Sequence, residues 1–424
     1  MSRRLTRKRA AISVALVACA SMALAACSSS GGSSGGSGST APAGTSSSTS
    51  SSSATTSGSD IKIMVIGSFQ SAAQSYPEVA SGAEAAADSI NAAGGVAGHK
   101  IKIIECNDQN DPNVSASCGR SAVSDKVVAV TSGVSNYSNQ FLPVLQASGI
   151  PDIGDTIYQA IDLTSPVAFP FDGGSFSQFA AVGQSLASNG CKKVGVVRVD
   201  APVTEAQAKL VFLGAKAENA ASGPDLAVAP TLPSFAATVQ TEINAGADCL
   251  ASILPNANVD ALIAAVKQSA KPDIRIGTAI STLPTTDLAK LNGSADNDIV
   301  VSPAYPVTTP QAAPFLADMK KYEPKATVSA FAVNSWAAIE AFATVGKTLT
   351  TFSASSVLDA FNKASNVTVP MYPAPFNFAK PNPVKSLARI INTSVLAFKI
   401  KGTSYEPLAQ STVDTAAVLK AYAG

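Results

Sequence analysis

The chain has 424 residues, of which 46% are hydrophobic and 14% charged, and its formal net charge is +1. This length gives room for two domains of ordinary size. The near-zero net charge excludes recognition of nucleic acid or of an anionic membrane by bulk electrostatics, because both require a strongly basic surface.

The first 26 residues predict an export signal. Basic residues at positions 3, 4 and 7–9 precede the apolar segment 10–26, which is too short and too rich in alanine for a membrane span. The segment ends in Leu-Ala-Ala-Cys at 24–27, which resembles a bacterial lipobox. This resemblance implies cleavage before Cys27 and attachment of diacylglycerol to its sulfur. The alternative is an ordinary secretory signal that ends at a cysteine by chance.

Residues 28–59 are almost wholly Ser, Gly, Thr and Ala, a composition that cannot bury enough apolar surface to fold. We therefore expect Cys27 and the following residues, 27–59, to form a flexible tether. Such a chain lets the folded part move about 30 Å from the membrane.

From residue 60 the chain predicts alternating strands and helices. A first strand covers 61–67, and a helix follows in which Ser75 and Glu78 form a capping box and the glycines at 94 and 95 mark the end. Strands at 100–105 and 126–131 come next, with another helix between them. This alternation predicts a parallel, doubly wound sheet, whose ligands bind in the loops after the strands.

A second series of alternating elements indicates a second α/β lobe. Strands are expected at 193–199, near 226, and at 249–254 and 275–277, with helices at 176–188, 205–221, 235–245 and 259–270. Beyond these, helices are expected at 314–321 and 330–349, a proline-rich crossing at 370–383, a strand at 394–400 and a helix at 413–423.

The cysteines indicate disulfides rather than a metal site. Cys19 lies in the signal and Cys27 takes the lipid, so an even number remains in an exported chain. Of the three possible connectivities, the pairs close in sequence, Cys106–Cys118 and Cys191–Cys249, are favoured. Metal binding is the weaker reading, because no Cys-x-x-Cys spacing occurs and His99, the only histidine, lies in a turn. No metal or cofactor is therefore expected.

Several blocks occur in a characteristic order, among them Ile-Asn-Ala-Ala-Gly-Gly-Val at 90–96. The others are 60–66, 97–101, 107–112, 141–145 and 149–151. Together they resemble the branched-chain amino-acid (Leu/Ile/Val) binding proteins of ABC importers. The resemblance implies a type I periplasmic-binding fold, with two doubly wound parallel-sheet lobes joined by three crossing segments and a ligand cleft between them. It implies lobe 1 at 60–174 and 304–376, and lobe 2 at 175–303 and 377–424.

The resemblance also implies where the ligand binds. The candidate residues are Ser68, Phe69, Gln70 and Tyr76 after the first strand, Asn136, Tyr137 and Ser138 after the third, Asp155, Thr156 and Tyr158 after the fourth, and Asp200 and Ser281 in lobe 2. Ser138 or Asn136 is expected to hold a carboxylate at a helix N-terminus. Ordinary helix capping by Ser135 or Asn136 is the alternative. Phe69, Tyr137 and Tyr158 are candidate aromatic walls.

Three departures from the family's pattern argue against an amino-acid ligand. Asp155 is a carboxylate where the family has none, so it could receive a cation or sugar-like hydroxyls, or cap a short helix. Residues 200–204 replace the family's Tyr-Gly, and 277–281 lack its acidic ligand for an ammonium group. The sequence therefore favours a small polar or amphipathic solute.

The predicted function is capture of this solute and its delivery to an ABC permease by a monomer that is lipid-anchored at the outer face of the bacterial cell membrane. A lipid-anchored ligand sensor with the same fold is the alternative. An exported hydrolase is disfavoured, because no Gly-x-Ser-x-Gly elbow appears between a strand and a helix, and Asp155 with Asp200 is the only carboxylate pair to test. No enzyme activity and no nucleic-acid partner are expected.

Overall fold

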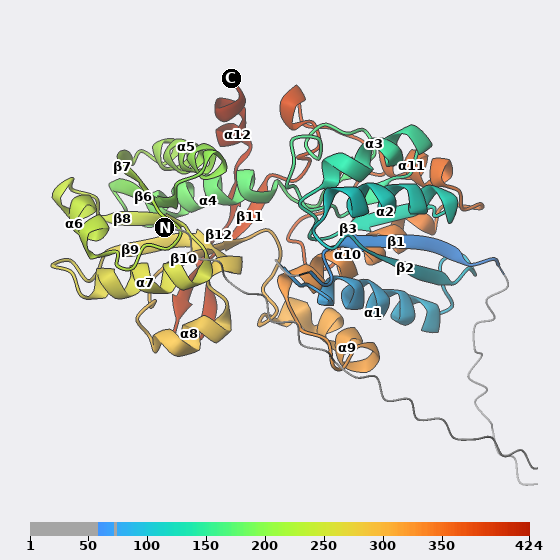
Figure 1. The fold of residues 1–424 in the computed structure, drawn as a ribbon, viewed down its shortest axis with the longest axis horizontal. Helices are drawn as coiled ribbons and strands as arrows, with labels where there is room; N and C mark the ends of the chain where they lie inside the picture. Colours follow the sequence, from blue (N-terminus) through green and yellow to red (C-terminus); the bar gives the residue numbers. More distant parts are fainter. Residues whose placement is uncertain (1–57, 72–73) are drawn as a thin grey trace, which may run out of the picture. The chain divides into compact units, whose positions relative to one another are not determined.

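The computed structural model describes residues 58–71 and 74–424, which form two β-sheets, each with helices on both faces (Figure 1). The predicted signal peptide, Cys27 and the tether up to residue 57 lie outside the described residues. Within the described part, none of the helices combines the length and the apolar character that crossing a membrane requires. The two lobes and their sheets agree with the predicted fold class.

The first sheet has five parallel strands in the order β2-β1-β3-β4-β5. The strands are β1 (Ile61–Gly67), β2 (Ile101–Asn107), β3 (Ala129–Ser132), β4 (Asp152–Ile153) and β5 (Ala168–Phe169). A strand that is covered on both faces needs a nearly continuous apolar sequence. This explains why β1, which pairs with both β2 and β3, reads Ile-Lys-Ile-Met-Val-Ile-Gly.

Helices from two distant parts of the sequence cover the first sheet (Figure 1). They are α1 (Glu78–Ala92), α2 (Pro112–Ser124), α3 (Ser138–Ser148), α9 (Ala313–Tyr322), α10 (Ala330–Gly346) and α11 (Ala354–Lys363). Apolar residues of α1 and α10 share one core with β1, whereas α2 and α3 pack on the other face. Trp336 of α10 is buried and its Nε1 donates to Asp318 Oδ2 at 3.0 Å. The late helices thus complete the core of the first lobe.

The predicted capping box at the start of α1 is wrong. The helix begins at Glu78, and the residue before it, Pro77, makes no side-chain cap. Ser75 instead donates its hydroxyl to the Phe69 carbonyl, and Glu78 accepts a hydrogen bond from Ser329. Both side chains therefore bind neighbouring segments, which removes them from the local pairing that the sequence suggested.

The second sheet has seven strands in the order β12-β11-β10-β9-β8-β6-β7. They are β6 (Lys193–Val199), β7 (Ala221–Val228), β8 (Cys249–Ile253), β9 (Arg275–Ala279), β10 (Ile299–Ser302), β11 (Ser394–Lys401) and β12 (Ser404–Asp414). β11 and β12 run antiparallel and form one edge. The predicted start of the last helix at Val413 is wrong, because Val413 pairs with Val395 in β12 and the helix begins at Ala416.

Helices again cover both faces of this second sheet (Figure 1). The helices are α4 (Gly174–Ser188), α5 (Pro202–Ala217), α6 (Ala236–Asn244), α7 (Asn256–Lys267), α8 (Thr285–Leu291) and α12 (Ala416–Ala423), with short 3-10 turns at Ile280–Thr282, Pro310–Ala312 and Lys385–Leu387. α4, α5 and α12 contribute to one core, and α6, α7 and α8 to the core on the opposite face.

The chain passes between the two sheets three times: after β5, after β10 and before β11. Contacts between these segments tie them together. Asn392 Nδ2 donates to the Phe171 carbonyl at 3.0 Å, and the Tyr305 amide donates to the Met371 carbonyl at 2.7 Å. Met371, Phe376 and Phe378 are buried in the first core, so the proline-rich stretch is part of that core and the last crossing follows it.

Both predicted disulfides are confirmed. Cys106 on β2 bonds to Cys118 on α2, and Cys191, two residues before β6, bonds to Cys249, the first residue of β8, with Cα separations of 5.7 and 5.9 Å. β6 and β8 are neighbours in the sheet, which is why the second pair meets. All four thiols are consumed, so they do not bind a metal.

Candidate functional site

The loops after β1, β2 and β3 meet at one buried carboxylate, Asp108. Its Oδ1 accepts the Ser68 hydroxyl at 2.6 Å and the Asn110 amide at 2.9 Å, and its Oδ2 accepts the Ser135 hydroxyl at 2.5 Å. Asp108 is 0% exposed. The sequence predicted Ser68 as a site residue but missed Asp108. Its position directly after a strand, at the same edge as Ser68, was the available signal.

Neutral carboxamides extend this network outward. Gln74 Nε2 donates to Ser68 Oγ at 2.9 Å, and Asn136 Nδ2 donates to Asn110 Oδ1 at 3.0 Å. Gln74 also lies 3.4 Å from both Asn110 Oδ1 and Asn136 Nδ2. The predicted residue Asn136 therefore lies with Gln74 and Asn110, which the sequence did not single out, in a half-buried group that can donate and accept hydrogen bonds.

Phe69 and Gln70 are held through Asn107. Asn107 Oδ1 accepts the Phe69 amide at 3.1 Å and the Gln70 amide at 3.4 Å, and its Nδ2 donates to the Gln70 carbonyl at 3.0 Å. Phe69 is only 7% exposed and belongs to the first core, so its ring lies behind the loop. Gln70 is exposed.

Aromatic side chains lie at the same edge of the sheet. The rings of Tyr76 and Phe331 meet edge to face at 4.8 Å. Tyr158 is 41% exposed, and its backbone amide donates to Asp162 Oδ2 at 2.9 Å. Tyr137 is half-buried, and its carbonyl accepts the Ser115 hydroxyl at 3.0 Å. The edge thus presents both flat apolar surface and phenolic hydroxyls.

Helix α10 joins the site through Asn334. Asn334 Nδ2 donates to the Gly154 carbonyl at 2.6 Å, and its Oδ1 accepts the Tyr372 hydroxyl at 2.8 Å. These contacts fix the loop after β4, which carries Thr156 and Tyr158, against a helix more than a hundred residues later. Both Asn334 and Thr156 are half-buried. Asn334 and Tyr372 were missed, because nothing local marks them.

Three buried aspartates lie behind the loop after β4. Asp152 accepts the amide and the hydroxyl of Ser132 at 2.8 and 2.6 Å, and burial raises its pKa to about 7. Asp155 is 4% exposed, and neither of its oxygens has a hydrogen-bond partner in the described part of the chain. Burial raises its pKa well above the usual value, the carboxyls of Asp152 and Asp162 raise it further, and the Arg389 guanidinium opposes them.

The structure does not show the helix capping that the sequence offered as an alternative role for Asp155 and for Ser135 or Asn136. Residues 154–158 are irregular, so Asp155 does not cap a short helix there. Ser138 is the first residue of α3 and is buried, and its hydroxyl has no partner among residues 58–71 and 74–424. The helix is preceded by Tyr137, which makes no side-chain cap, so the expected capping by Ser135 or Asn136 is not seen.

Asp172, which the sequence analysis missed, follows β5 at the first crossing. Its Oδ1 accepts the Gly174 amide at 2.6 Å, and the side chain is only partly buried. Burial raises its pKa to about 6, against the Gly174 amide, whose hydrogen bond lowers it. Burial raises the pKa of both Tyr158 and Tyr372, and the nearby Asp172 carboxylate raises each pKa further, because an anion disfavours a phenolate.

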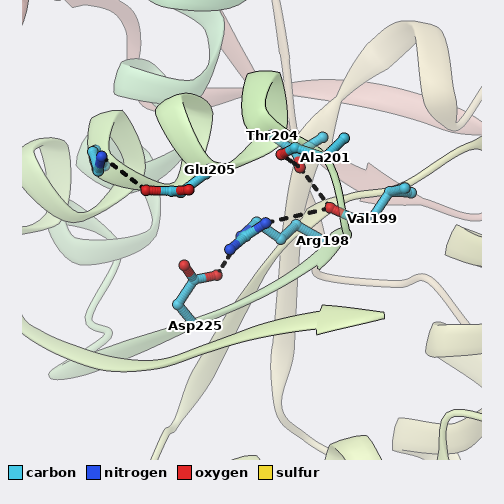
Figure 2. Close-up of polar contacts among 7 residues, drawn as sticks. Arg198, Val199, Ala201, Thr204, Glu205 and Asp225 are labelled. Carbon is cyan, nitrogen blue, oxygen red and sulfur yellow. Dashed lines mark hydrogen bonds and ion pairs between the residues drawn. The ribbon is translucent and has the colours of Figure 1, made fainter. Parts of the chain in front are cut away.

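The second sheet contributes fewer candidates. Asp200 and Ser281 are both exposed and follow β6 and β9 respectively. Figure 2 shows that Arg198, near Asp200 in sequence, is already engaged: its Nε lies 2.7 Å from Asp225 Oδ1, and Thr204 donates to the carbonyls of Val199 and Ala201 beside it. Arg198 therefore links β6 to β7, and Thr204 fixes the start of α5.

A family model described as periplasmic binding protein matches residues 60–385, most of the chain. The chain belongs to the periplasmic binding protein family. Members of this family bind solutes and are not enzymes, and membership implies a location outside the cytoplasm. No curated protein matches the chain by sequence.

Solved structures of solute-binding proteins share the fold of this periplasmic binding protein. The leucine-, isoleucine-, valine-, threonine- and alanine-binding protein from Brucella ovis is 16% identical, with 84% of this chain and 95% of that one covered and a TM-score of 0.69. A fatty acid ABC transporter substrate-binding protein from Thermomonospora curvata is 13% identical, with 85% and 94% covered and a TM-score of 0.67. The R. palustris solute binding protein in complex with 4-hydroxybenzoate is 17% identical, with 84% and 97% covered and a TM-score of 0.65.

These likenesses confirm the predicted type I fold with two lobes. Their low identity means that they carry information on the fold alone, and the residues at the strand ends of this binding protein must be interpreted from its own structure.

A surface hollow on this binding protein lies away from these loops. It has a volume of about 400 Å³ and is lined by Asp60, Glu84, Lys100 and Glu323, among others. Asp60 and Lys100 directly precede β1 and β2, so this hollow is at the amino ends of the strands. Ligands of doubly wound sheets bind at the opposite, carboxyl ends. The loops around Asp108 are therefore the better candidate site.

The role of Asp108 can be tested with Asp108→Asn. The change removes the charge while keeping the size, so both serine hydroxyls lose a charged acceptor and one of them faces an NH2 group in place of an oxygen. We expect about 2 kcal/mol lower stability by urea unfolding, because a hydrogen bond to a charged group contributes about 1.5–3 kcal/mol. Asp111→Asn, which keeps an oxygen to cap α2, is the matched control and should cost less. Equal losses in the two variants would contradict a special role for Asp108.

Proposed function

We propose that this chain is a lipid-anchored, extracytoplasmic solute-binding protein that captures a small polar or amphipathic solute and delivers it to an ABC permease. Family membership supports solute binding, and the edge of the first sheet supports the class of solute. The single observation that carries the proposal is the cluster organised by Asp108, whose buried serine hydroxyls hold three loops together so that half-buried carboxamides lie next to half-exposed rings.

In this proposal, residues 60–174 and 304–376 form lobe 1, residues 175–303 and 377–424 form lobe 2, and the solute binds between them. The ring of Phe378, just past the second boundary, also packs in the core of lobe 1. Contacts from both lobes favour a closed arrangement, and only this difference in affinity shifts the hinge equilibrium. The permease recognises the closed, loaded form. The binding protein acts as a monomer, tethered by the lipid on Cys27.

The ligand-binding residues that we propose come from the loops after the strands. Those predicted from the sequence are Gln70, Tyr76, Asn136, Tyr137, Thr156 and Tyr158 on the first lobe, with Asp200 and Ser281 on the second. The other predicted residues, Ser68, Phe69, Ser138 and Asp155, support these loops from behind, since all four are buried. Gln74, Asn110, Asp172, Phe331 and Asn334 are added from the structure.

The proposal is tested by thermal unfolding of the purified chain in the presence of amino acids, amides, sugars, polyols, aromatic acids and amines. A solute that binds only the folded state raises the melting temperature with its concentration, because the stabilisation follows RT ln(1 + [L]/Kd). We expect one chemical class to do so, and Asn136→Ala together with Gln74→Ala to abolish the shift. If no solute raises the melting temperature, solute capture is wrong for this chain.

A further inference from the structure

One carboxylate and four rings lie in the segments that follow β1, β4 and β5 and in the late segments packed on the first sheet. Asp172 lies at this crossing, Tyr158 follows β4, Tyr372 belongs to the stretch after α11, and the Tyr76–Phe331 pair lies where the loop after β1 meets α10. Asp172 is partly exposed, as are Tyr76, Phe331 and Tyr158. We call Asp172, Tyr158, Tyr372, Tyr76 and Phe331 the aromatic–acid group.

Packing contacts bring the segment that carries Asp172 close to the segments that carry two of the rings. Phe171, which precedes Asp172, packs its ring against Tyr372 at a centroid distance of 5.3 Å. Gly174, whose amide binds Asp172, has φ of +54°, and a Cβ placed there would lie only 3.0 Å from Ile157, the neighbour of Tyr158. A glycine is required at this close approach, and residues 171–174 therefore pack against the segments that carry Tyr158 and Tyr372.

One oxygen of the Asp172 carboxylate is left for a ligand. Its Oδ1 takes the Gly174 amide, whereas its Oδ2 accepts no hydrogen bond from the residues that the structure describes. A buried or half-buried carboxylate is stabilised by a partner that supplies positive charge or donors.

Cations of the protein do not supply this partner. The loops at 68–76, 107–111, 133–138, 154–159 and 170–174 contain no Lys or Arg, and neither do 200–205 and 280–285 on the second sheet. Arg198 is paired with Asp225. Arg389 lies over the Phe169 ring at 4.3 Å, and its Nε and backbone amide donate to the carbonyls of Ala168 and Leu163.

We propose that the solute is an organic cation whose ammonium group binds at Asp172 among the rings of the aromatic–acid group. The inference rests on the proposed function and names its substrate class. Aromatic faces attract ammonium groups through the ring quadrupole, and alkylated ammonium ions also bury their methyl groups against the rings. The negative charge of Asp172 would repel an anionic solute, and the loops contain no lysine or arginine to offset this repulsion.

Choline and its uncharged carbon analogue, 3,3-dimethylbutan-1-ol, provide the test, since the two have nearly the same shape. Binding to the purified chain is measured by calorimetry and by thermal unfolding, with tetramethylammonium and phenethylammonium as further cations. We expect at least one cation to bind, and the uncharged analogue of choline to bind about tenfold or more weakly than choline.

Substitutions at Asp172 and Tyr158 test whether the cation binds at the aromatic–acid group. Asp172→Asn keeps an oxygen for the Gly174 amide but removes the charge, so cation affinity should fall about tenfold or more. Tyr158→Phe keeps the ring and should change affinity less than Tyr158→Leu, which removes it. Asp88→Asn, at an exposed carboxylate on α1, is the matched control and should bind the cation as the unchanged protein does.

The outcomes separate this inference from the function on which it rests. Binding of uncharged or anionic solutes only, or unchanged cation binding in Asp172→Asn, overturns the inference but leaves solute capture standing. If neither the cations nor any other solute class binds, both the inference and the proposed function fail.

Discussion

Replacing Cys191 and Cys249 together by alanine should lower the free energy of unfolding by about 4 kcal/mol, because the disulfide closes a long loop in the unfolded chain. The two cysteines are 58 residues apart in sequence, and the bond lies between the neighbouring strands β6 and β8. Urea unfolding of the oxidised protein and of the double variant measures the loss.

The other disulfide is the control for this effect. Cys106 and Cys118 are only 12 residues apart, so their double alanine variant should lose about 3 kcal/mol on the same entropic scale. The larger loss is therefore expected for the longer loop. The opposite order would show that strain or packing, rather than loop closure, governs the stability that the two disulfides provide.

Glu242→Met should raise stability by about 3 kcal/mol at pH 7, since each unit of pKa shift corresponds to about 1.4 kcal/mol. Glu242 on α6 is 0% exposed, and neither carboxyl oxygen has a hydrogen-bond partner among the described residues. A Cβ on Gly195 would lie 2.1 Å from Glu242 Oε2, so the carboxyl occupies the space above β6. Methionine fills a similar volume without a polar group.

The direction of the pH effect follows from the raised pKa of Glu242. Burial, and secondarily the Asp225 charge, raises this pKa from 4.5 to about 8, although Lys193 opposes the shift. Below pH 4.5 the carboxyl is protonated in both the folded and the unfolded state and has no effect. Between 4.5 and 8 only the unfolded state ionises, so stability falls as pH rises, and above 8 the penalty is constant.

Unfolding at pH 4, 5, 6, 7 and 8 therefore gives the sharpest readout. The gap between Glu242→Met and the unchanged protein should widen over this range. Glu205→Gln is the matched control, because Glu205 is on the surface and paired with Lys209 at 2.9 Å (Figure 2). The stability gap between Glu205→Gln and the unchanged protein should not widen in the same way. A constant gap for Glu242→Met would show that the carboxyl ionises in the folded protein near its usual pKa.

Elements with strong local patterns were predictable from the sequence. β1 is a seven-residue apolar strand that ends at a glycine, and α10 carries apolar residues on all sides, so each pattern specifies its element. The cysteines at the starts of two neighbouring strands predicted their disulfide. By contrast, β12 was missed, because most of its residues are polar and exposed at the sheet edge, and only Tyr405 and Val413 are buried.

The candidate site was predictable only in part, because its geometry depends on segments that are distant in sequence. The loops themselves followed from the fold, and Ser68 and Asn136 do lie in the polar cluster. Asp108 could not be assigned its role without knowing that three loops meet at it. Asp172 lies in Pro-Phe-Asp-Gly-Gly, which resembles an ordinary turn, and Glu242 resembles a surface residue of an amphipathic helix.

The dependence of the first core on α10 has a consequence for the order of folding during export. β1 enters the extracytoplasmic space first, yet the apolar face that it shares with α1 is covered only after residues 330–346 and the rings at 376 and 378 have followed. Contacts between residues so far apart in sequence slow folding, because the intervening chain must be ordered before they form. The second sheet has β6 to β10 within one continuous stretch, 193–302, and can assemble while the end of the chain is still being translocated. We therefore expect β6 to β10 of the second sheet to assemble before the first core is complete, with the apolar strands of the first sheet in need of protection until residues 330–378 arrive.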